Sequence, residues 1–292
     1  MRVVISIVNY NTEELTKQCL ESIFSTKNKN DYEVWVVDNA STDGSVNMIK
    51  EFKRVRLIEN NANLGFGAAH NIVLKKADAP YLLILNSDCQ VGEDVLDNMV
   101  TFMEKNPEAA ITSCKILGFD GKLQPSAGDL PLGLALFSWL FNLEVLGINK
   151  SFHRNEPEYY KGVHEVGWVS GNFMLIRSSV IKKIGCFNER FFMYFEDTEY
   201  CYRAKKAGYQ IMINPEVSIK HLSGGSLDDP KLRQWGGEYK GLVLFYNQYN
   251  GVLAGLFIKI LVYISVFLRI IIYGLNGKLN YSNTYAKIIF SI

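Results

Sequence analysis

The sequence has almost no net charge and no paired cysteine motif. Its 292 residues include 31 Lys and Arg against 30 Asp and Glu, which gives a formal net charge of +1. Without a basic excess, we expect no nucleic-acid partner. The five cysteines are scattered and no two of them form a CxxC pair, which argues against the usual zinc and redox dithiol motifs. An odd set of unpaired cysteines is typical of a reducing compartment.

The N-terminus lacks the long apolar run of a secretory signal peptide. One Arg is followed by six apolar-leaning residues, at positions 3–8, before the polar segment Asn9-Tyr10-Asn11. The apolar region of a signal peptide usually has about 7 to 15 residues. We therefore expect a cytoplasmic protein.

The C-terminal region lacks an uninterrupted apolar run long enough to cross a membrane. Residues 251–275 are strongly apolar, but Lys259 and Arg269 leave only nine uninterrupted apolar-leaning residues between them, and a spanning helix needs about 20. We interpret residues 251–292 as an apolar helical tail in the membrane interface, with both basic side chains reaching for water. The alternative is a helix that packs on the rest of the chain or on the second protomer of a homodimer.

Residues 3 to about 115 alternate between strand-like and helix-like patterns. Strands are predicted at residues 3–8, 34–38, 55–59 and 81–86, and helices at residues 12–24, from about 45, at 67–77 and at 93–105. This alternation predicts an α/β fold with a doubly wound, mostly parallel central sheet flanked by helices. Ligands of such sheets bind where the carboxyl ends of the strands open into a crevice.

Polar residues follow each of these predicted strands. Asp38 begins a loop of small donors and acceptors, which suits a heterocycle and a ribose. We expect Asp43 or Ser45 to cap the next helix and Asp38 to stay free for the ligand. An Asx-turn at this loop is the alternative.

Asp88 follows the fourth strand, in the segment Asn86-Ser87-Asp88. An aspartate at a strand end in a ligand crevice is placed to hold a hard divalent cation, which also takes oxygen ligands from substrate phosphates. A turn or helix cap before Glu93 explains this stretch equally well when the stretch is taken alone.

Carboxylates are concentrated in a helix predicted at residues 195–208. Glu199 lies four residues before Arg203, which is the spacing of an intrahelical ion pair. Asp197 points about 100° away from Glu196, which leaves Asp197 to face a crevice and accept a proton. His221 follows another strand-like segment and precedes a Ser-Gly loop that can close over a phosphate.

Taken together, these motifs resemble the family 2 inverting glycosyltransferases of the GT-A fold, and among them the rhamnosyltransferase-like branch. The resemblance covers residues 3 to about 226 and rests on the order of its motifs. These are NYN, VVDNASTDGS, NxNxGFGxAxN, LLILNSD, GxxxLIR, GxFxExFFMYxEDxExCxR and HLSGGS. We therefore expect a catalytic domain at residues 1–250, with a donor-binding half at about 1–115 and an acceptor-side half at about 116–250, followed by the apolar tail at 251–292.

The resemblance also implies roles for individual residues. It assigns the nucleotide sugar to Asn9, Asp38, Asn39, Asp43, Asn63, Gly65, Asn71 and Asp88. It assigns the acceptor side to Trp168, Gly171, Asn172 and Glu196. Asp197 matches the catalytic base, and Asp88 and His221 match the groups that hold Mg²⁺ or Mn²⁺. Asn86 stands where the family often has the first aspartate of its DxD motif, which leaves open whether the metal dependence is strict.

The implied reaction is the inverting transfer of a sugar, with rhamnose as one candidate, from a dTDP- or UDP-sugar to a hydroxyl of a growing cell-surface glycan. The acceptor is a glycan or a lipid-linked glycan, and the enzyme is expected to be peripheral at the inner face of the plasma membrane. A nucleotidyltransferase is the first alternative, but the segment after the first strand has no Gly-rich basic loop. A non-catalytic nucleotide-sugar-binding subunit is the second, but Asp88 and Asp197 are both present. A dehydrogenase is not expected, because His70 stands where the third glycine of the dinucleotide fingerprint belongs.

Overall fold

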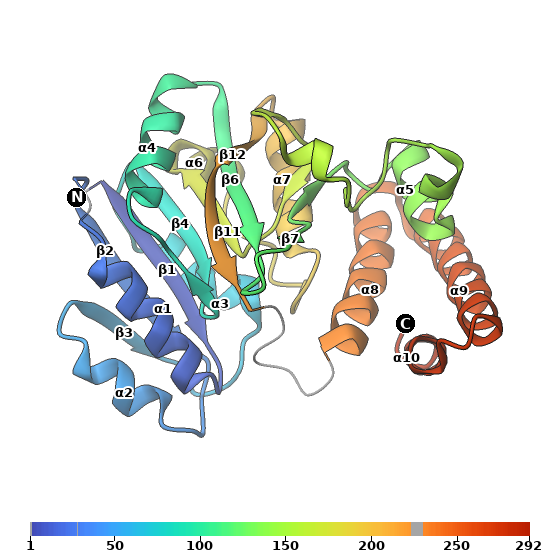
Figure 1. Cartoon of the computed structure of the whole chain (residues 1–292), viewed down its shortest axis with the longest axis horizontal. Coiled ribbons are helices and arrows are strands. Elements are labelled where there is room, and N and C mark those ends of the chain that lie inside the picture. The colour runs from blue at the N-terminus through green and yellow to red at the C-terminus, as the bar shows by residue number, and fades with distance from the viewer. Residues whose placement is uncertain (1, 28, 223–229) are drawn as a thin grey trace. The chain divides into compact units, whose positions relative to one another are not determined.

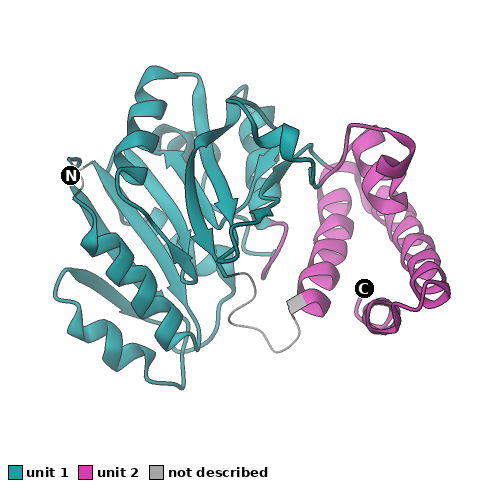
Figure 2. Ribbon diagram, in the orientation of Figure 1, with its two compact units in different colours: residues 1–130, 153–192, 196–226 teal, residues 131–152, 193–195, 227–292 magenta. Residues whose placement is uncertain are grey.

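The computed structural model describes residues 2–27, 29–222 and 230–292 (Figure 1), which form two compact units (Figure 2). Unit 1 comprises residues 1–130, 153–192 and 196–226, and unit 2 comprises residues 131–152, 193–195 and 227–292. The Ser-Gly loop predicted after His221 lies, from residue 223 onward, outside the described residues. Unit 1 contains the predicted sheet, and the regular elements of unit 2 are helices.

Unit 1 is built on a central sheet with the strand order β3-β2-β1-β4-β11-β6-β12-β5. The first four strands in this order are parallel, and β6 and β12 also pair in parallel, whereas β11 is antiparallel to both β4 and β6. The long strands are β1 (Val3–Asn9), β2 (Tyr32–Asp38), β3 (Val55–Glu59), β4 (Tyr81–Asn86), β6 (Ala109–Leu117), β11 (Phe173–Arg177) and β12 (Gln210–His221). The predicted α/β fold with a central sheet flanked by helices is confirmed.

Helices cover both faces of this sheet because successive residues of a strand point to opposite sides. Ile5 and Ile7 of β1 share a buried cluster with Leu20 and Ile23 of α1, and α2 and α4 contribute to the same cluster. Val4 of β1 belongs to a second buried cluster with residues of α3. The helices of this unit are α1 (Glu13–Ser25), α2 (Ser45–Glu51), α3 (Phe66–Leu74), α4 (Val95–Lys105), α6 (Ser178–Ile184) and α7 (Glu196–Lys206), with a 3₁₀ turn η2 at Pro157–Tyr160.

The strand-like run at residues 165–177 is not one strand but three short pieces. They are β9 (His164–Glu165), β10 (Trp168–Val169) and β11, with Gly167 and Gly171 between them. A Cβ at Gly167 would lie 2.6 Å from the carbonyl carbon of Asp129, and one at Gly171 would lie 2.8 Å from the ring of Phe66. Both glycines therefore allow a close approach that any larger residue would prevent.

Short strands and one unpredicted long strand complete unit 1. The short strands are β5 (Cys89–Gln90), β7 (Leu123–Gln124) and β8 (Ala127–Gly128), and β8 pairs with β10 in a second, two-stranded sheet. The long strand β6 was not predicted from the sequence pattern. Its central residues Thr112 and Ser113 are both fully buried, so the strand does not show the apolar-polar alternation of a half-buried strand.

Unit 2 groups the C-terminal helices with an earlier part of the chain. It contains α5 (Gly133–Phe141), the 3₁₀ turn η1 (Leu143–Leu146), α8 (Pro230–Asn250), α9 (Val252–Leu275) and α10 (Leu279–Ile289). Helix α9 packs against α8, α10 and α5. The boundary that we predict at residue 250 falls inside this unit, between α8 and α9.

Helix α9 is long and apolar enough to cross a membrane by length and composition, yet one of its two basic residues is used inside the protein. Arg269 is 8% exposed, and its guanidinium donates to the carbonyls of Trp139 and Leu140 at 2.6 and 3.2 Å and to the hydroxyl of Tyr285 at 3.1 Å. The expectation that Arg269 reaches for water is wrong. Its charge satisfies carbonyl groups at the C-terminal end of α5, which lack partners within that helix.

Candidate active site

The carboxyl ends of β1, β2 and β4 meet at one edge of the sheet. The register pairs Asn9 with Asp38 and Val8 with Asn86. The start of β11 lies at the same edge, because the backbone N–H of Asn86 donates to the carbonyl of Asn172 at 3.1 Å. Polar residues that follow separate strands in the sequence are therefore close together in the fold.

Asn9 and Asp38 form a buried hydrogen-bonded pair. Nδ2 of Asn9 donates to Oδ2 of Asp38 at 2.6 Å, and Oδ1 of Asn9 accepts from the hydroxyls of Thr12 and Thr16 at 2.7 and 2.6 Å. Oδ1 of Asp38 accepts from the backbone N–H of Ser41 at 2.9 Å. The prediction that Asp38 stays free is wrong, because both carboxylate oxygens bind protein groups and the residue is 1% exposed. The alternative, a turn closed by the Asp38 side chain, agrees with these contacts.

Asn39, Asn63 and Gly65 join the loops that follow β2 and β3. Nδ2 of Asn39 donates to Oδ1 of Asn63 at 3.3 Å and to the carbonyl of Gly65 at 3.2 Å, and Oδ1 of Asn63 also accepts from the N–H of Gly65 at 2.9 Å. Gly65 has a φ of +83°, and a Cβ there would collide with the carbonyl of Phe192. Three of the predicted donor-binding residues are thus joined by hydrogen bonds just before α3.

Asp43 and Asn71 support helices. The carboxylate of Asp43 accepts from the first backbone N–H groups of α1 and α2, at Glu13 and Ser45, with distances of 3.1 and 3.0 Å, and this is the capping role predicted for it. The Asn71 amide donates to the carbonyl of Phe187 and accepts from its N–H, both at 2.9 Å. Asn71 therefore ties α3 to the segment before α7, and a contact with the donor stays a prediction.

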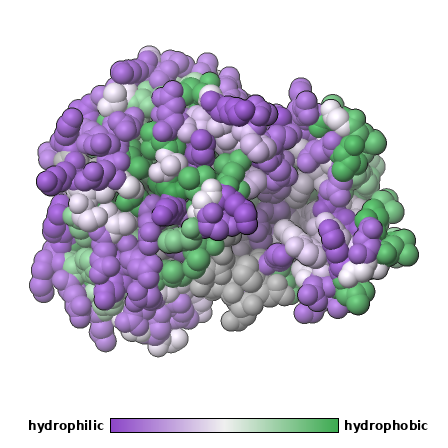
Figure 3. All heavy atoms as spheres, in the orientation of Figure 1, coloured by the Kyte–Doolittle hydropathy of each residue, from purple (hydrophilic) through white to green (hydrophobic). Residues whose placement is uncertain are grey.

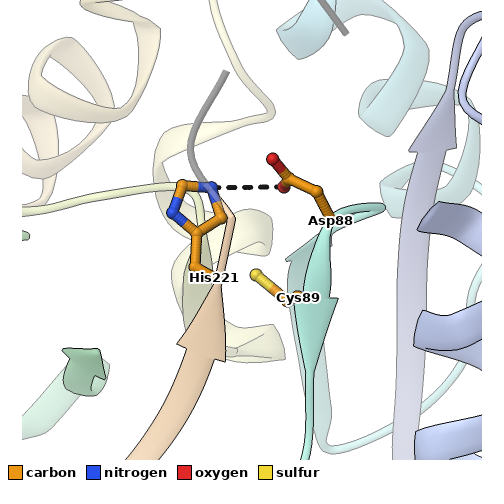
Figure 4. A group of neighbouring side chains, drawn as sticks. All are labelled: Asp88, Cys89 and His221. Atoms are coloured by element: carbon orange, nitrogen blue, oxygen red, sulfur yellow. Dashed lines mark ion pairs between the residues drawn. The ribbon is translucent and has the colours of Figure 1, made fainter. Parts of the chain in front are cut away.

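Asp88 and His221 face each other across the sheet edge (Figure 4). Oδ1 of Asp88 lies 3.2 Å from Nε2 of His221 at the end of β12, and the two side chains are 11% and 7% exposed. Sγ of Cys89 completes a cluster of three possible ligand atoms. Burial raises the pKa of the Cys89 thiol well above its usual value, and this thiol donates to the carbonyl of Asn172. Asp88 and His221 are thus the better ligands for a hard cation.

Gln124 on β7 fixes the orientation of His221 and was missed by the sequence analysis. Oε1 of Gln124 lies 2.7 Å from Nδ1 of His221, and Nε2 of Gln124 donates to the carbonyl of the same histidine at 2.9 Å. Because the amide oxygen can only accept, the hydrogen must be on Nδ1. The turn residues Gly118 and Gly121 were the available signal for the β6–β7 hairpin that carries Gln124.

This tautomer determines what the Asp88–His221 pair can bind. A neutral imidazole with its hydrogen on Nδ1 presents a lone pair at Nε2 to the carboxylate oxygen. Two acceptors 3.2 Å apart repel each other unless a cation or a proton binds there. The residues present therefore fit a divalent cation with one carboxylate and one imidazole ligand, which leaves positions for phosphate oxygens and water.

Two hydrogen bonds, joined by short stretches of backbone, connect this pair to Asp197. Asn86, two residues before Asp88, donates through its side-chain amide to Oδ1 of Asn172 at 2.8 Å. The neighbouring Gly171 donates its backbone N–H to Oδ2 of Asp197 at 3.0 Å. Oδ1 of Asp197 accepts from the N–H of Thr198 at 2.6 Å, at the start of α7. The structure thus brings together Asp88, Asn172, Gly171 and Asp197.

The other acidic residues of α7 are buried, as is Trp168. Glu199 is fully buried and pairs with Arg203 at 2.8 Å, which is the predicted structural ion pair. Glu196 is 4% exposed, and its Oε2 has no hydrogen-bond partner among the residues that the structure describes. Trp168 lies on β10, three residues before Gly171, with its buried ring 5.5 Å from that of His153.

The sheet and the two carboxylate centres at its edge define the class that the motifs predict, a glycosyltransferase of the GT-A fold. Solved structures share this fold. The mannosyltransferase PcManGT from Pyrobaculum calidifontis, in complex with GDP-Man and Mn²⁺, has a TM-score of 0.61 at 15% identity and covers 99% of this chain and 85% of its own. TarS 1-349 of S. aureus has a TM-score of 0.57 at 17% identity and covers 100% and 80%.

Sequence comparison gives the family. Residues 4–185 match the model of glycosyl transferase family 2. The chain is 28% identical over 232 residues to the N-acetylglucosaminyl-diphospho-decaprenol L-rhamnosyltransferase of Mycobacterium tuberculosis, with 73% of each chain covered. It is 29% identical over 229 residues to the rhamnosyltransferase WbbL of Escherichia coli, with 76% of this chain and 83% of WbbL covered. The chain belongs to glycosyl transferase family 2 and is a glycosyltransferase.

The buried Glu196 gives a testable pH dependence of stability. Burial, and next the charge of Asp197, raise the pKa of Glu196 well above its usual range. The folded chain then binds one proton more than the unfolded chain at pH values between the unfolded and the folded pKa. Within that window the free energy of unfolding falls as the pH rises, by about 1.4 kcal/mol per pH unit.

We expect Glu196→Gln to remove this loss, so that the stability of the variant relative to the wild type increases from pH 5 to pH 8. Urea unfolding across this range measures the difference. Glu158→Gln, at an exposed position in η2, is the control, and its free energy of unfolding should change with pH as that of the wild type does. If the free energy of unfolding of Glu196→Gln also follows the wild type across this pH range, the shifted pKa is contradicted.

Proposed function

We propose that the chain transfers a sugar, with inversion, from a nucleotide-diphospho sugar to a hydroxyl of a lipid-linked glycan used in cell-surface glycan synthesis. The observation that carries this proposal is the hydrogen-bonded connection between the Asp88–His221 pair and Asp197 at the strand ends. The names of the two rhamnosyltransferases above support rhamnose as the sugar, and we propose dTDP or UDP as the nucleotide. The first of them is named for a lipid-linked N-acetylglucosaminyl acceptor.

The donor occupies the edge formed by β1, β2 and the loop before α3 in this proposal. Asn9 and Asp38 hold the loop at residues 39–41 in place. Hydrogen bonds among Asn39, Asn63 and Gly65 hold the loop before α3. These buried residues orient backbone groups that line the nucleotide site. The rigid loops reduce the ordering cost of binding.

Asp88 and His221 would hold Mg²⁺ or Mn²⁺. When bound there, the cation would supply positive charge to offset the negative charge of the departing nucleoside diphosphate. Gln124 keeps Nε2 of His221 directed toward Asp88. Asn86 donates a hydrogen bond that an aspartate could not make, so its side chain serves the β4–β11 connection.

Asp197 is the general base. Backbone N–H groups of Gly171 and Thr198 orient its carboxylate. The acceptor hydroxyl gives its proton to Asp197 while its oxygen forms the bond to the anomeric carbon. The bond from that carbon to the diphosphate breaks on the opposite face, and the leaving group keeps the electron pair. Gly171, Asn172, Glu196 and Trp168 form the acceptor side.

We also propose that the enzyme works at the inner face of the plasma membrane, where a lipid-linked acceptor lies. One face of α9 is exposed and apolar, with positions that recur every three or four residues. They are Leu253, Leu256, Phe257, Ile260, Ile264, Phe267, Leu268, Ile271, Ile272 and Leu275. Figure 3 shows hydrophobic side chains gathered over α5 and α9.

Charge favours an anionic bilayer over another apolar protein surface as the partner of this face. Residues 239–292 contain five basic residues and no acidic residue. The opposite side of α9 packs on α8 and α10, which carry many polar side chains. An α9 that crossed the bilayer would carry these helices into hydrocarbon, so we propose that it lies in the interface plane.

Asp88→Ala should abolish Mn²⁺-dependent donor binding, because it removes the carboxylate ligand. The donor is chosen among dTDP-rhamnose, UDP-glucose and UDP-N-acetylglucosamine as the one that raises the melting temperature most. Calorimetry with and without Mn²⁺ should show a loss of at least about tenfold in affinity for the variant, only when Mn²⁺ is present. An affinity equal to that of the wild type under both conditions would remove Asp88 as a ligand.

Asp197→Asn should keep donor binding within about twofold and lower kcat by at least about a hundredfold, because the amide cannot accept the proton. The assay measures nucleoside diphosphate released in the presence of an N-acetylglucosaminyl-diphospho-lipid acceptor. Glu165→Gln, a partly exposed carboxylate of unit 1, controls for the loss of an acid elsewhere. Wild-type turnover by Asp197→Asn would overturn its assignment as the base.

The full chain should sediment with vesicles of phosphatidylcholine and phosphatidylglycerol more than with phosphatidylcholine alone. The double variant Ile260→Asn with Phe267→Asn, on the exposed face of α9, should lose at least about tenfold of this binding. Phe119→Asn, at an exposed aromatic residue of unit 1, is the control. If the wild-type chain does not bind vesicles but forms a soluble dimer, and the double variant is a monomer, the face contacts a second copy of the chain instead.

A further inference from the structure

Two bulky residues with left-handed backbone conformation directly precede α7. Tyr194 has a φ of +67° and Phe195 a φ of +83°. Such values are unusual for bulky side chains and persist only where surrounding structure enforces them. Asp197 is the second residue of α7, so the strained pair determines where the helix that carries it begins.

Two glycines of α8 provide the surface that holds this segment. Gly237 and Gly241 are four residues apart and therefore lie on the same face of α8. A Cβ on Gly237 would lie 2.6 Å from Cδ2 of Tyr194, and a Cβ on Gly241 would lie 2.8 Å from Cγ of Phe195. Both distances are shorter than any real carbon contact. The backbone of α8 thus approaches the segment more closely than any other residue would allow.

The side chain of Phe195 is locked in an aromatic cluster of unit 2. It is 2% exposed, and its ring centre lies 5.5 Å from that of Phe152 and 5.8 Å from that of Phe245. Phe245 is on α8, one turn after Gly241. Because the interior is close-packed, Phe195 cannot move away from an added methyl group without displacing these rings.

We propose that Gly237 and Gly241 are positioning residues for Asp197, since they hold Tyr194 and Phe195 in the conformation that sets the first turn of α7. This inference rests on the proposed role of Asp197 as the base. The N–H of Gly171 reaches Oδ2 of Asp197 at 3.0 Å, and a shift of the helix start would break this contact. The hydrogen bonds that Asn9 and Asp38 make at the ends of β1 and β2 do not include this segment, so we expect catalysis to respond more strongly than donor binding.

Gly241→Ala tests the proposal. The variant should lower kcat by at least about tenfold while the donor dissociation constant changes by less than about twofold. Gly236→Ala is the matched control on the same helix, where the nearest atom to a new Cβ is the hydroxyl oxygen of Ser291 at 3.2 Å. Both substitutions raise the helix propensity of α8 equally. The donor and the lipid acceptor are those of the Asp197 assay, and circular dichroism monitors folding.

A folded Gly241→Ala variant with the kcat of Gly236→Ala would overturn the proposal, as would an equal loss of kcat and donor affinity. If Gly241→Ala does not fold, Gly237→Ala replaces it, because its Cβ would meet both the ring of Tyr194 at 2.6 Å and the backbone carbonyl of Met193 at 3.1 Å, at a position that is less buried. The same split between kcat and donor affinity is then expected, and wild-type kcat would overturn the proposal. If Asp197→Asn is inactive and Gly241→Ala is fully active, only the positioning role is rejected. If Asp197→Asn is active, the assignment of Asp197 as the base is rejected.

Discussion

Two hydrogen bonds between Asn86 and Asn172 hold the proposed active site together. One joins the backbones at the end of β4 and the start of β11, and the other joins the two side-chain amides. Asp88 lies two residues beyond the first asparagine, and Gly171, which binds Asp197, precedes the second. The distance between a cation site and a base is therefore set by the pairing of antiparallel strands, which is among the more rigid connections in a sheet. It also gives a physical reason for an asparagine rather than an aspartate at residue 86, since a carboxylate cannot donate to the amide oxygen of Asn172.

The strands and helices of the first half of the fold could be predicted from the sequence, because their apolar periodicity is visible within each short segment. Four strands and the helices between them have the apolar periods of an α/β unit, and the predicted bounds of β3 and β4 agree with the structure. Strand β6 was missed because buried Thr112 and Ser113 break the hydrophobic run. The broken strand at residues 165–177 depends on Gly171 meeting the ring of Phe66, a contact between residues a hundred positions apart that no local pattern contains.

Only part of the candidate site could be predicted from the sequence. Asp88, His221 and Asp197 could be selected because acidic and imidazole groups after strands are chemically conspicuous, and the fold brings them to one edge. Asp38 was expected to be free, yet the fold uses both of its oxygens. Gln124 was not selected at all, since an amide in a short hairpin becomes informative only when its partner is known. Sequence reasoning selected the candidate reactive groups, whereas the groups that orient them required the structure.

The central claim is that the ends of β4 and β12 form the cation site of a glycosyltransferase whose base is Asp197. The unit with the apolar face of α9 also supplies the segment before α7, so one helical unit serves both the membrane and the base in this account. The most direct measurement is anomalous diffraction at the manganese edge from crystals of the full chain soaked with Mn²⁺ and dTDP. The account predicts a peak bonded to Oδ1 of Asp88 and Nε2 of His221. A peak elsewhere in the crevice, with that pair still in contact, would contradict it.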